Sequence, residues 1–201
     1  MTALGRAAAH ATPGAMPQPA PAPPPELRQR TIALVGLMGV GKSSIGRRLA
    51  RALDLPFFDA DEEIERAAGR SVAEIFAERG ETEFRDGERR VIARLLAGPP
   101  HVLATGGGAF VRPDTRAILK AGAVTVWLKA DLPILARRVA RKDTRPLLRG
   151  RDPLQVLTEQ AEARYPAYAE ADLTVDCGDG SHAAGVDAVL RALAAHVKAA
   201  A

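Results

Sequence analysis

The sequence is poor in the residues from which disulfides, zinc sites and aromatic binding surfaces are built. Its 201 residues include one cysteine, Cys177, and aromatic side chains make up only 4% of the chain. A single cysteine excludes an internal disulfide and disfavours a cysteine-based zinc site, so we interpret Cys177 as a small core residue. The histidines lack the spacing of metal ligands, and we expect them to be surface or packing residues. They are His10, His101, His182 and His196.

The chain also lacks a long apolar run. No stretch approaches the roughly 18 residues that cross a bilayer, and the N-terminus has no apolar region of the kind found in secretory signals. We therefore expect a cytoplasmic protein without a membrane partner. The net charge is +4, but the arginines are spread over several segments and aromatics are few. We expect anionic small molecules, and no nucleic acid, as partners.

Residues 1–30 are rich in alanine and proline and contain almost nothing that could form a core. We interpret them as a disordered extension. Residues 31–201 have the length of a single domain, and 47% of the whole chain is hydrophobic, which is enough for a proper core.

Residues 36–43, GLMGVGKS, have the spacing G-x-x-x-x-G-K-[ST] of a phosphate-binding loop. An apolar, β-rich run at residues 31–35 precedes them, and apolar residues at helical spacing follow. In this context the glycines let backbone N–H groups surround phosphate oxygens at the start of a helix. Lys42 would reach the β- and γ-phosphates, and the Ser43 hydroxyl would be a ligand for Mg²⁺. The alternative is a glycine-rich turn with a chance lysine.

Two further apolar runs end in residues that suit a binding cleft. The first stops at Asp59 and Asp61, which can face one cleft because alternate residues of an extended chain point the same way. Asp61 could equally cap the helix that begins at Glu62, and the residues alone leave both interpretations open. The second run, residues 101–105, leads into GGG at 106–108, which indicates close approach of another group to the backbone, a hinge or a flexible turn.

Two charged features complete the pattern. Arg85 and Glu88 lie three residues apart on one face of a predicted helix, where a surface ion pair is the alternative interpretation. Arginines crowd around the RPLL at residues 145–148. We interpret residues 140–152 as a mobile lid over phosphates, although a solvated charged loop would show the same composition.

Strands alternating with helices, a phosphate-binding loop on the first unit and a late arginine lid indicate a small P-loop phosphotransferase. From Thr31 onward the chain resembles the shikimate kinases in a set of motifs that occur in the same order. These are GLMGVGKSS, FFDAD, FR followed by a glutamate, ATGGG, RPLL and the arginine before Tyr165-Pro166. The resemblance implies a monomeric α/β P-loop three-layer sandwich, like the nucleoside monophosphate kinases, with a five-stranded parallel sheet flanked by helices. It also implies phosphorylation of the shikimate 3-hydroxyl by ATP, a step of aromatic amino-acid biosynthesis.

The resemblance also implies a role for each matching residue. Asp61 would hydrogen-bond the reacting hydroxyl, Arg145 would reach the transferred phosphoryl group, and Glu88 would orient Arg85. The implied catalytic residues are Lys42, Asp61 and Arg145. Those implied for ATP are Gly39, Val40, Gly41, Lys42, Ser43, Ser44, Arg138 and Arg145. Those implied for shikimate are Asp61, Arg85, Gly106, Gly107, Gly108 and Arg164, and those for Mg²⁺ are Ser43 and, through water, Asp59.

Two other functions remain open at this point. A gluconate kinase would share the scaffold but would not need the triple glycine together with Arg85 and Arg164. A regulatory module that binds a nucleotide without turnover would not need Lys42, Asp61 and Arg145 together.

Overall fold

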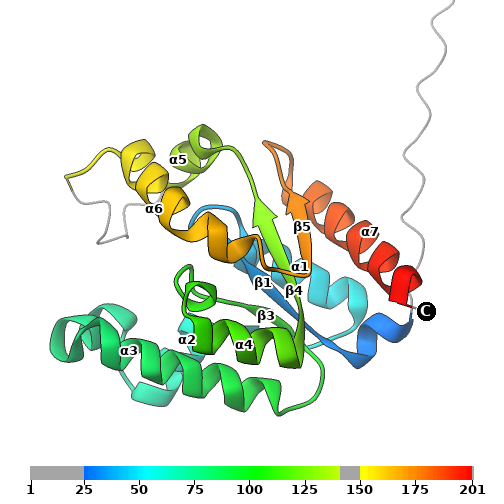
Figure 1. The fold of residues 1–201 in the computed structure, drawn as a ribbon, viewed down its shortest axis with the longest axis horizontal. Coiled ribbons are helices and arrows are strands. Elements are labelled where there is room, and N and C mark those ends of the chain that lie inside the picture. Colours follow the sequence, from blue (N-terminus) through cyan, green and yellow to red (C-terminus); the bar gives the residue numbers. More distant parts are fainter. Residues whose placement is uncertain (1–24, 141–149, 201) are drawn as a thin grey trace, which may run out of the picture.

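The computed structural model describes residues 25–140 and 150–200 (Figure 1). Residues 1–24 lie outside the described residues. So do most of the predicted lid and the predicted phosphoryl contact Arg145.

Five short strands form one parallel sheet, in the order β2-β3-β1-β4-β5. The strands are β1 (Thr31–Val35), β2 (Phe57–Asp59), β3 (Val102–Ala104), β4 (Ala123–Lys129) and β5 (Leu173–Asp176). The central strand β1 pairs with β3 on one side and with β4 on the other, and β1 and β3 are buried throughout. Such burial is typical of a parallel sheet that is covered on both faces. The predicted fold class is confirmed.

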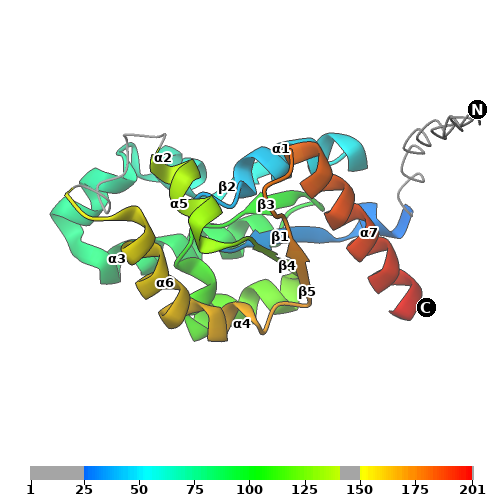
Figure 2. The same ribbon diagram turned by 90° about the horizontal axis from the view of Figure 1, so that it is seen from above.

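Helices cover both faces of the sheet. Helices α1 and α7 pack on one face, while α4 and α6 lie on the opposite one (Figures 1 and 2). Helices α2 and α3 pack against each other and enclose a small apolar cluster of their own. The helices are α1 (Lys42–Leu53), α2 (Ala60–Ala68), α3 (Val72–Leu96), α4 (Pro113–Gly122), α5 (Leu132–Ala140), α6 (Pro153–Tyr168) and α7 (His182–Ala200). In the described part of the chain, none of them is long and apolar enough to cross a membrane.

Helix α3 follows local sequence signals closely. Ser71 and Glu74 form the reciprocal hydrogen bonds of a capping box, which fixes the start of the helix. At Gly80 the backbone has φ 77° and ψ 176°, a conformation that residues other than glycine rarely adopt. The helix is therefore kinked there, and its second half begins at Glu81.

The domain begins earlier in the chain than residue 31. A 3₁₀ helix, η1 (Pro25–Gln29), precedes β1, and Leu27 within it is only 3% exposed. This leucine joins the main core, and η1 packs against α7. The boundary predicted at residue 30 is therefore moved, because one buried leucine fixes a segment whose composition suggested no structure.

Candidate active site

A cleft of about 1180 Å³ lies where the carboxyl ends of the strands meet. Its walls come from the segments that follow β1, β2 and β3, and from α5, α6 and the start of α7. Open α/β sheets bind ligands at this edge. The cleft brings together the predicted site residues Lys42, Ser43, Ser44, Asp59, Asp61, Arg85, Gly106, Gly107, Gly108, Arg138 and Arg164.

The loop between β1 and α1 has the backbone curl that its glycines predicted. Gly36 has φ 139°, and a Cβ atom there would lie 2.5 Å from the Leu128 carbonyl oxygen. Gly39 has φ 82°, and its Cβ would lie 2.6 Å from a methyl carbon of Val139. Gly41 is the N-cap of α1 and has no side chain to satisfy the first N–H groups of the helix. These groups and the helix dipole suit a phosphate. The buried Val40 can offer only backbone groups.

The two polar side chains that follow Gly41 make different contacts. Lys42 Nζ donates to the carbonyl oxygens of Gly36 (2.8 Å) and Leu37 (3.1 Å), so the ammonium lies over the loop itself. Ser43 Oγ donates to Asp59 Oδ2 at 2.6 Å, which links the first turn of α1 to the end of β2. A lysine and a hydroxyl at these places face the same cleft.

The structure separates the roles of the two aspartates. Asp59, and not Asp61, is the N-cap of α2, because its Oδ1 accepts a 3.1 Å hydrogen bond from the Asp61 backbone N–H. The Asp61 carboxylate lines the cleft. Although it is accessible from the cleft, loss of hydration between the surrounding walls raises the pKa of Asp61, and the neighbouring charge of Asp59 raises it further. Lys42 and Arg85 act in the opposite direction.

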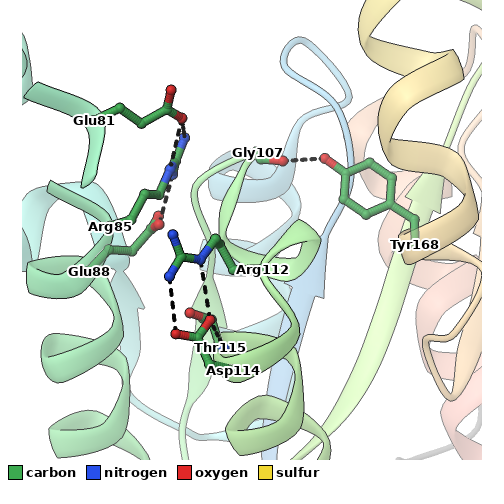
Figure 3. A network of polar contacts seen from close by, with 8 residues as sticks. All are labelled: Glu81, Arg85, Glu88, Gly107, Arg112, Asp114, Thr115 and Tyr168. Carbon is green, nitrogen blue, oxygen red and sulfur yellow. Dashed lines mark hydrogen bonds and ion pairs between the residues drawn. The ribbon is translucent and has the colours of Figure 1, made fainter. Parts of the chain in front are cut away.

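Arg85 is held by two carboxylates on its own helix. Its Nη1 donates to Glu88 Oε2 at 2.7 Å, while Nε and Nη2 both lie 3.3 Å from Glu81 Oε1 (Figure 3). Glu88 is fully buried, and this burial raises its pKa, while the Arg85 charge and hydrogen bond oppose the rise. The predicted contact between Glu88 and Arg85 is confirmed, and the buried pair fixes the guanidinium at the cleft wall.

The three glycines after β3 pack against the charged side chains of the site. A Cβ at Gly106 would lie 2.6 Å from Glu88 Oε1, and one at Gly107 would lie 3.0 Å from Arg164 Nη1. A Cβ at Gly108 would lie 2.6 Å from the guanidinium carbon of Arg85. A charged side chain therefore lies close to each glycine, which favours close approach over a hinge or a flexible turn as the interpretation of the GGG sequence. The two arginines consequently lie against neighbouring residues of one loop.

Tyr168 connects this loop to α6. Its hydroxyl donates to the Gly107 carbonyl oxygen (Figure 3), and the residue is 1% exposed. Burial raises the pKa of Tyr168 to about 12, so the hydroxyl keeps its proton over the working pH range of most enzymes. Arg164 lies one helical turn earlier on α6, and the tyrosine thus fixes the distance between that arginine and the glycine loop.

Beside the phosphate-binding loop, the chain after β5 contributes cleft residues that the sequence did not identify. Arg138 donates to the Gly178 carbonyl oxygen at 3.0 Å, and Arg137 pairs with Asp179 at 2.7 Å. The His182 ring lies 3.3 Å from where a Cβ of Gly41 would be. His182 is exposed, as expected of a surface residue, and it also lines the cleft, a position that no local motif marks.

The oxygen ligands present suit Mg²⁺ when a nucleotide supplies the others. Within residues 25–140 and 150–200, no group of three or more histidine, cysteine or acidic residues could hold a metal by itself. Magnesium in phosphoryl-transfer sites takes one or two protein oxygens and completes its shell with phosphates and water. The hydroxyl of Ser43 and the carboxylate of Asp59, 2.6 Å apart, fit that requirement.

A phosphate-binding loop, a cleft carboxylate and several arginines at one edge of a parallel sheet define a small P-loop phosphotransferase. The family model described as "Shikimate kinase" matches residues 38–194. Shikimate kinase from Caulobacter vibrioides strain NA1000 is 70% identical over 167 residues, which cover 83% of this chain and 84% of that protein. The chain belongs to the shikimate kinase family.

Solved structures agree with this assignment. The structure of shikimate kinase from Acinetobacter baumannii in complex with shikimate is 35% identical, covers 87% of this chain and 98% of its own, and has a TM-score of 0.78. A gluconokinase structure from Sinorhizobium meliloti 1021 covers 85% of this chain and 97% of its own, with 20% identity and a TM-score of 0.59. At that identity the gluconokinase shows the shared fold alone.

Proposed function

We propose that this protein is an ATP:shikimate 3-phosphotransferase, which transfers the γ-phosphoryl group of ATP to the 3-hydroxyl of shikimate and releases ADP. The observation that carries the proposal is the placement of Arg85 and Arg164 against Gly108 and Gly107, in the same cleft as Asp61 and the phosphate-binding loop. Shikimate is a ring carboxylate with hydroxyl groups, so its binding site needs cationic side chains near the carboxylate and a base near the reacting hydroxyl. The shikimate present in the Acinetobacter baumannii structure supports this choice of acceptor.

Arg85 and Arg164 bind the carboxylate of the acceptor. A guanidinium presents a planar fork of donors that matches a carboxylate. Glu88 holds Arg85 through a hydrogen bond. Gly106, Gly107 and Gly108 let the shikimate ring approach the backbone. Such preorganisation lowers the cost of ordering the complex.

Asp61 accepts the proton of the attacking hydroxyl. The hydroxyl oxygen forms a bond to the γ-phosphorus, the bond to the bridging oxygen breaks, and ADP leaves. A carboxylate whose pKa is raised is a stronger base than an ordinary aspartate, which suits this role. Lys42 stabilises the charge on the phosphates, and the family resemblance assigns a similar role to Arg145.

ATP lies along the phosphate-binding loop. The residues that bind it are Gly39, Val40, Gly41, Lys42, Ser43, Ser44 and Arg138, the last beside the adenine. Ser43 and, through water, Asp59 would hold Mg²⁺, which would supply positive charge to the phosphates. The fit of those two oxygens to a magnesium shell supports this assignment.

The protein acts as a cytoplasmic monomer, with no membrane or nucleic acid partner. Support for a monomer comes from the family resemblance. The reaction is a step in the biosynthesis of aromatic amino acids, as it is for the family.

The proposal is tested by ADP release from ATP and Mg²⁺ with shikimate, gluconate or a nucleoside monophosphate as acceptor. We expect stimulation by shikimate alone, and a loss of about 10²–10³ in rate for Lys42→Ala, as for removal of one charge-stabilising donor. Stimulation by gluconate or a nucleoside monophosphate would show that the assignment of shikimate as the acceptor is wrong. No stimulation by any acceptor, with ATP still bound, would indicate a regulatory module.

A further inference from the structure

The guanidinium of Arg85 is occupied on all three of its nitrogen atoms by carboxylates of the same chain. Glu88 takes Nη1, and Glu81 accepts from both Nε and Nη2 (Figure 3). The Nε and Nη2 pair forms one of the parallel donor edges by which arginine binds a carboxylate. A substrate carboxylate that uses this edge must therefore replace Glu81.

The two glutamates differ in how firmly they are held. The Glu88 side chain is fully buried and 2.7 Å from Arg85, whereas the Glu81 side chain is 69% exposed and lies at 3.3 Å. A buried, short ion pair is costly to break, while an exposed, long one contributes little. Gly108 also lies close against the guanidinium of Arg85. Glu81 is the partner that can leave.

The Glu81 carboxylate is also stabilised when it is not paired with Arg85. It follows the kink at Gly80 and opens the second half of α3. A carboxylate in the first turn of a helix is stabilised by the helix dipole. Release of Glu81 into water therefore leaves no buried or unfavourably placed charge.

We propose that Glu81 occupies the carboxylate-binding edge of Arg85 as an internal competitor, which the carboxylate of the substrate displaces. The inference rests on the proposed function and adds a residue that sets the affinity for an acidic acceptor. Because Glu81 neutralises the edge, an anion that makes no other contacts in the site gains less from Arg85. A substrate that also reaches Arg164 and Asp61 overcomes the competition.

The test is a kinetic comparison of Glu81→Gln with the unaltered protein. We expect KM for shikimate to fall about 1.5- to 5-fold, the range that an exposed ion pair supplies, with kcat and KM for ATP unchanged. Glu83→Gln is the matched control, because Glu83 lies on the same helix and forms an exposed pair with Arg79 at 2.9 Å. We expect no change in KM for that variant.

The methyl ester of shikimate, which has no carboxylate charge, provides a second control. We expect its KM to be the same for the unaltered protein and for Glu81→Gln. A KM for shikimate that rises or stays constant in Glu81→Gln, while the unaltered protein is active, would overturn this inference alone. If the unaltered protein shows no ADP release with shikimate, both the proposed function and this inference are wrong.

Discussion

Ser43 of helix α1 donates a 2.6 Å hydrogen bond to Asp59, the residue that caps helix α2. The bond joins the phosphate-binding loop to the carboxyl end of a different strand. It also places a hydroxyl and a carboxylate oxygen side by side in the cleft, next to the phosphate-binding loop. Asp59 therefore has two separate roles, one in the helix and one in the proposed magnesium site.

Asp59→Asn separates these two roles. Asparagine is as good an N-cap as aspartate, so we expect the Tm to stay close to that of the unaltered protein. The Mg²⁺ concentration for half-maximal rate should rise about 10- to 100-fold, as for other residues that support a metal through water. Titration of the rate with Mg²⁺ checks this, with the exposed Asp187→Asn as control. An unchanged Mg²⁺ requirement would exclude Asp59 from the metal site.

We expect Asp61→Asn to lower the activity and to raise the stability of the fold at neutral pH. We expect kcat to fall by about 10² to 10⁴, the usual contribution of a general base. The folded protein raises the pKa of Asp61 above its ordinary value of 3.8, so the folded state binds the proton more tightly than the unfolded state. Stability is therefore lost as pH rises through the interval between those two pKa values.

The Tm of Asp61→Asn at neutral pH should consequently exceed that of the unaltered protein. Both proteins should approach the same Tm when the pH falls below the ordinary pKa of aspartate, because the carboxyl is then neutral in both states. Thermal unfolding without nucleotide, from pH 3 to pH 7, measures the difference. A lower Tm for the variant at pH 7 would mean that Asp61 stabilises the fold as a charged group.

Tyr168→Phe tests whether α6 positions the acceptor site. Removal of the hydroxyl leaves the Gly107 carbonyl without its donor. Loss of one such hydrogen bond costs about 1 kcal/mol, which corresponds to about a fivefold change in an equilibrium constant. We expect this change in KM for shikimate, with KM for ATP constant. Tyr165→Phe is a matched control, because Tyr165 packs on Trp127 in the same aromatic cluster but donates no hydrogen bond among those found in the described chain. Equal effects of the two variants would indicate a packing role only.

Leu27→Ala tests the start of the domain. Leu27 is 3% exposed in the main core, so its truncation should cost about 2–5 kcal/mol of the free energy of unfolding. Leu154→Ala, at a position that is 39% exposed, should change it by no more than about 0.5 kcal/mol. Urea unfolding of the two variants gives the comparison, and equal midpoints would show that η1 contributes nothing to stability.

Much of the fold and the cleft could be predicted because the signals are local. The phosphate-binding loop, Asp59, Asp61 and the three glycines each follow an apolar run, and parallel strands bring such segments to one edge. The capping box at Ser71 can likewise be predicted from four consecutive residues. These features needed no knowledge of the tertiary structure.

The features that were missed depend on contacts between distant segments. His182 reaches Gly41 only because α7 packs on α1, and Leu27 is buried only because η1 packs on α7. The choice between Asp59 and Asp61 as helix cap depended on a two-residue difference in where the helix starts, which sequence patterns do not fix. The predictions for Arg145 and the lid concern residues that the structure does not describe.

The most direct test of the proposed reaction is identification of its product. The protein is incubated with ATP, Mg²⁺ and shikimate, and the product is examined by ³¹P and ¹H nuclear magnetic resonance. We predict one phosphomonoester, with phosphorus coupled to the proton on carbon 3 of the ring. Phosphate on another hydroxyl, or ADP accompanied only by inorganic phosphate, would contradict the placement of the 3-hydroxyl beside Asp61.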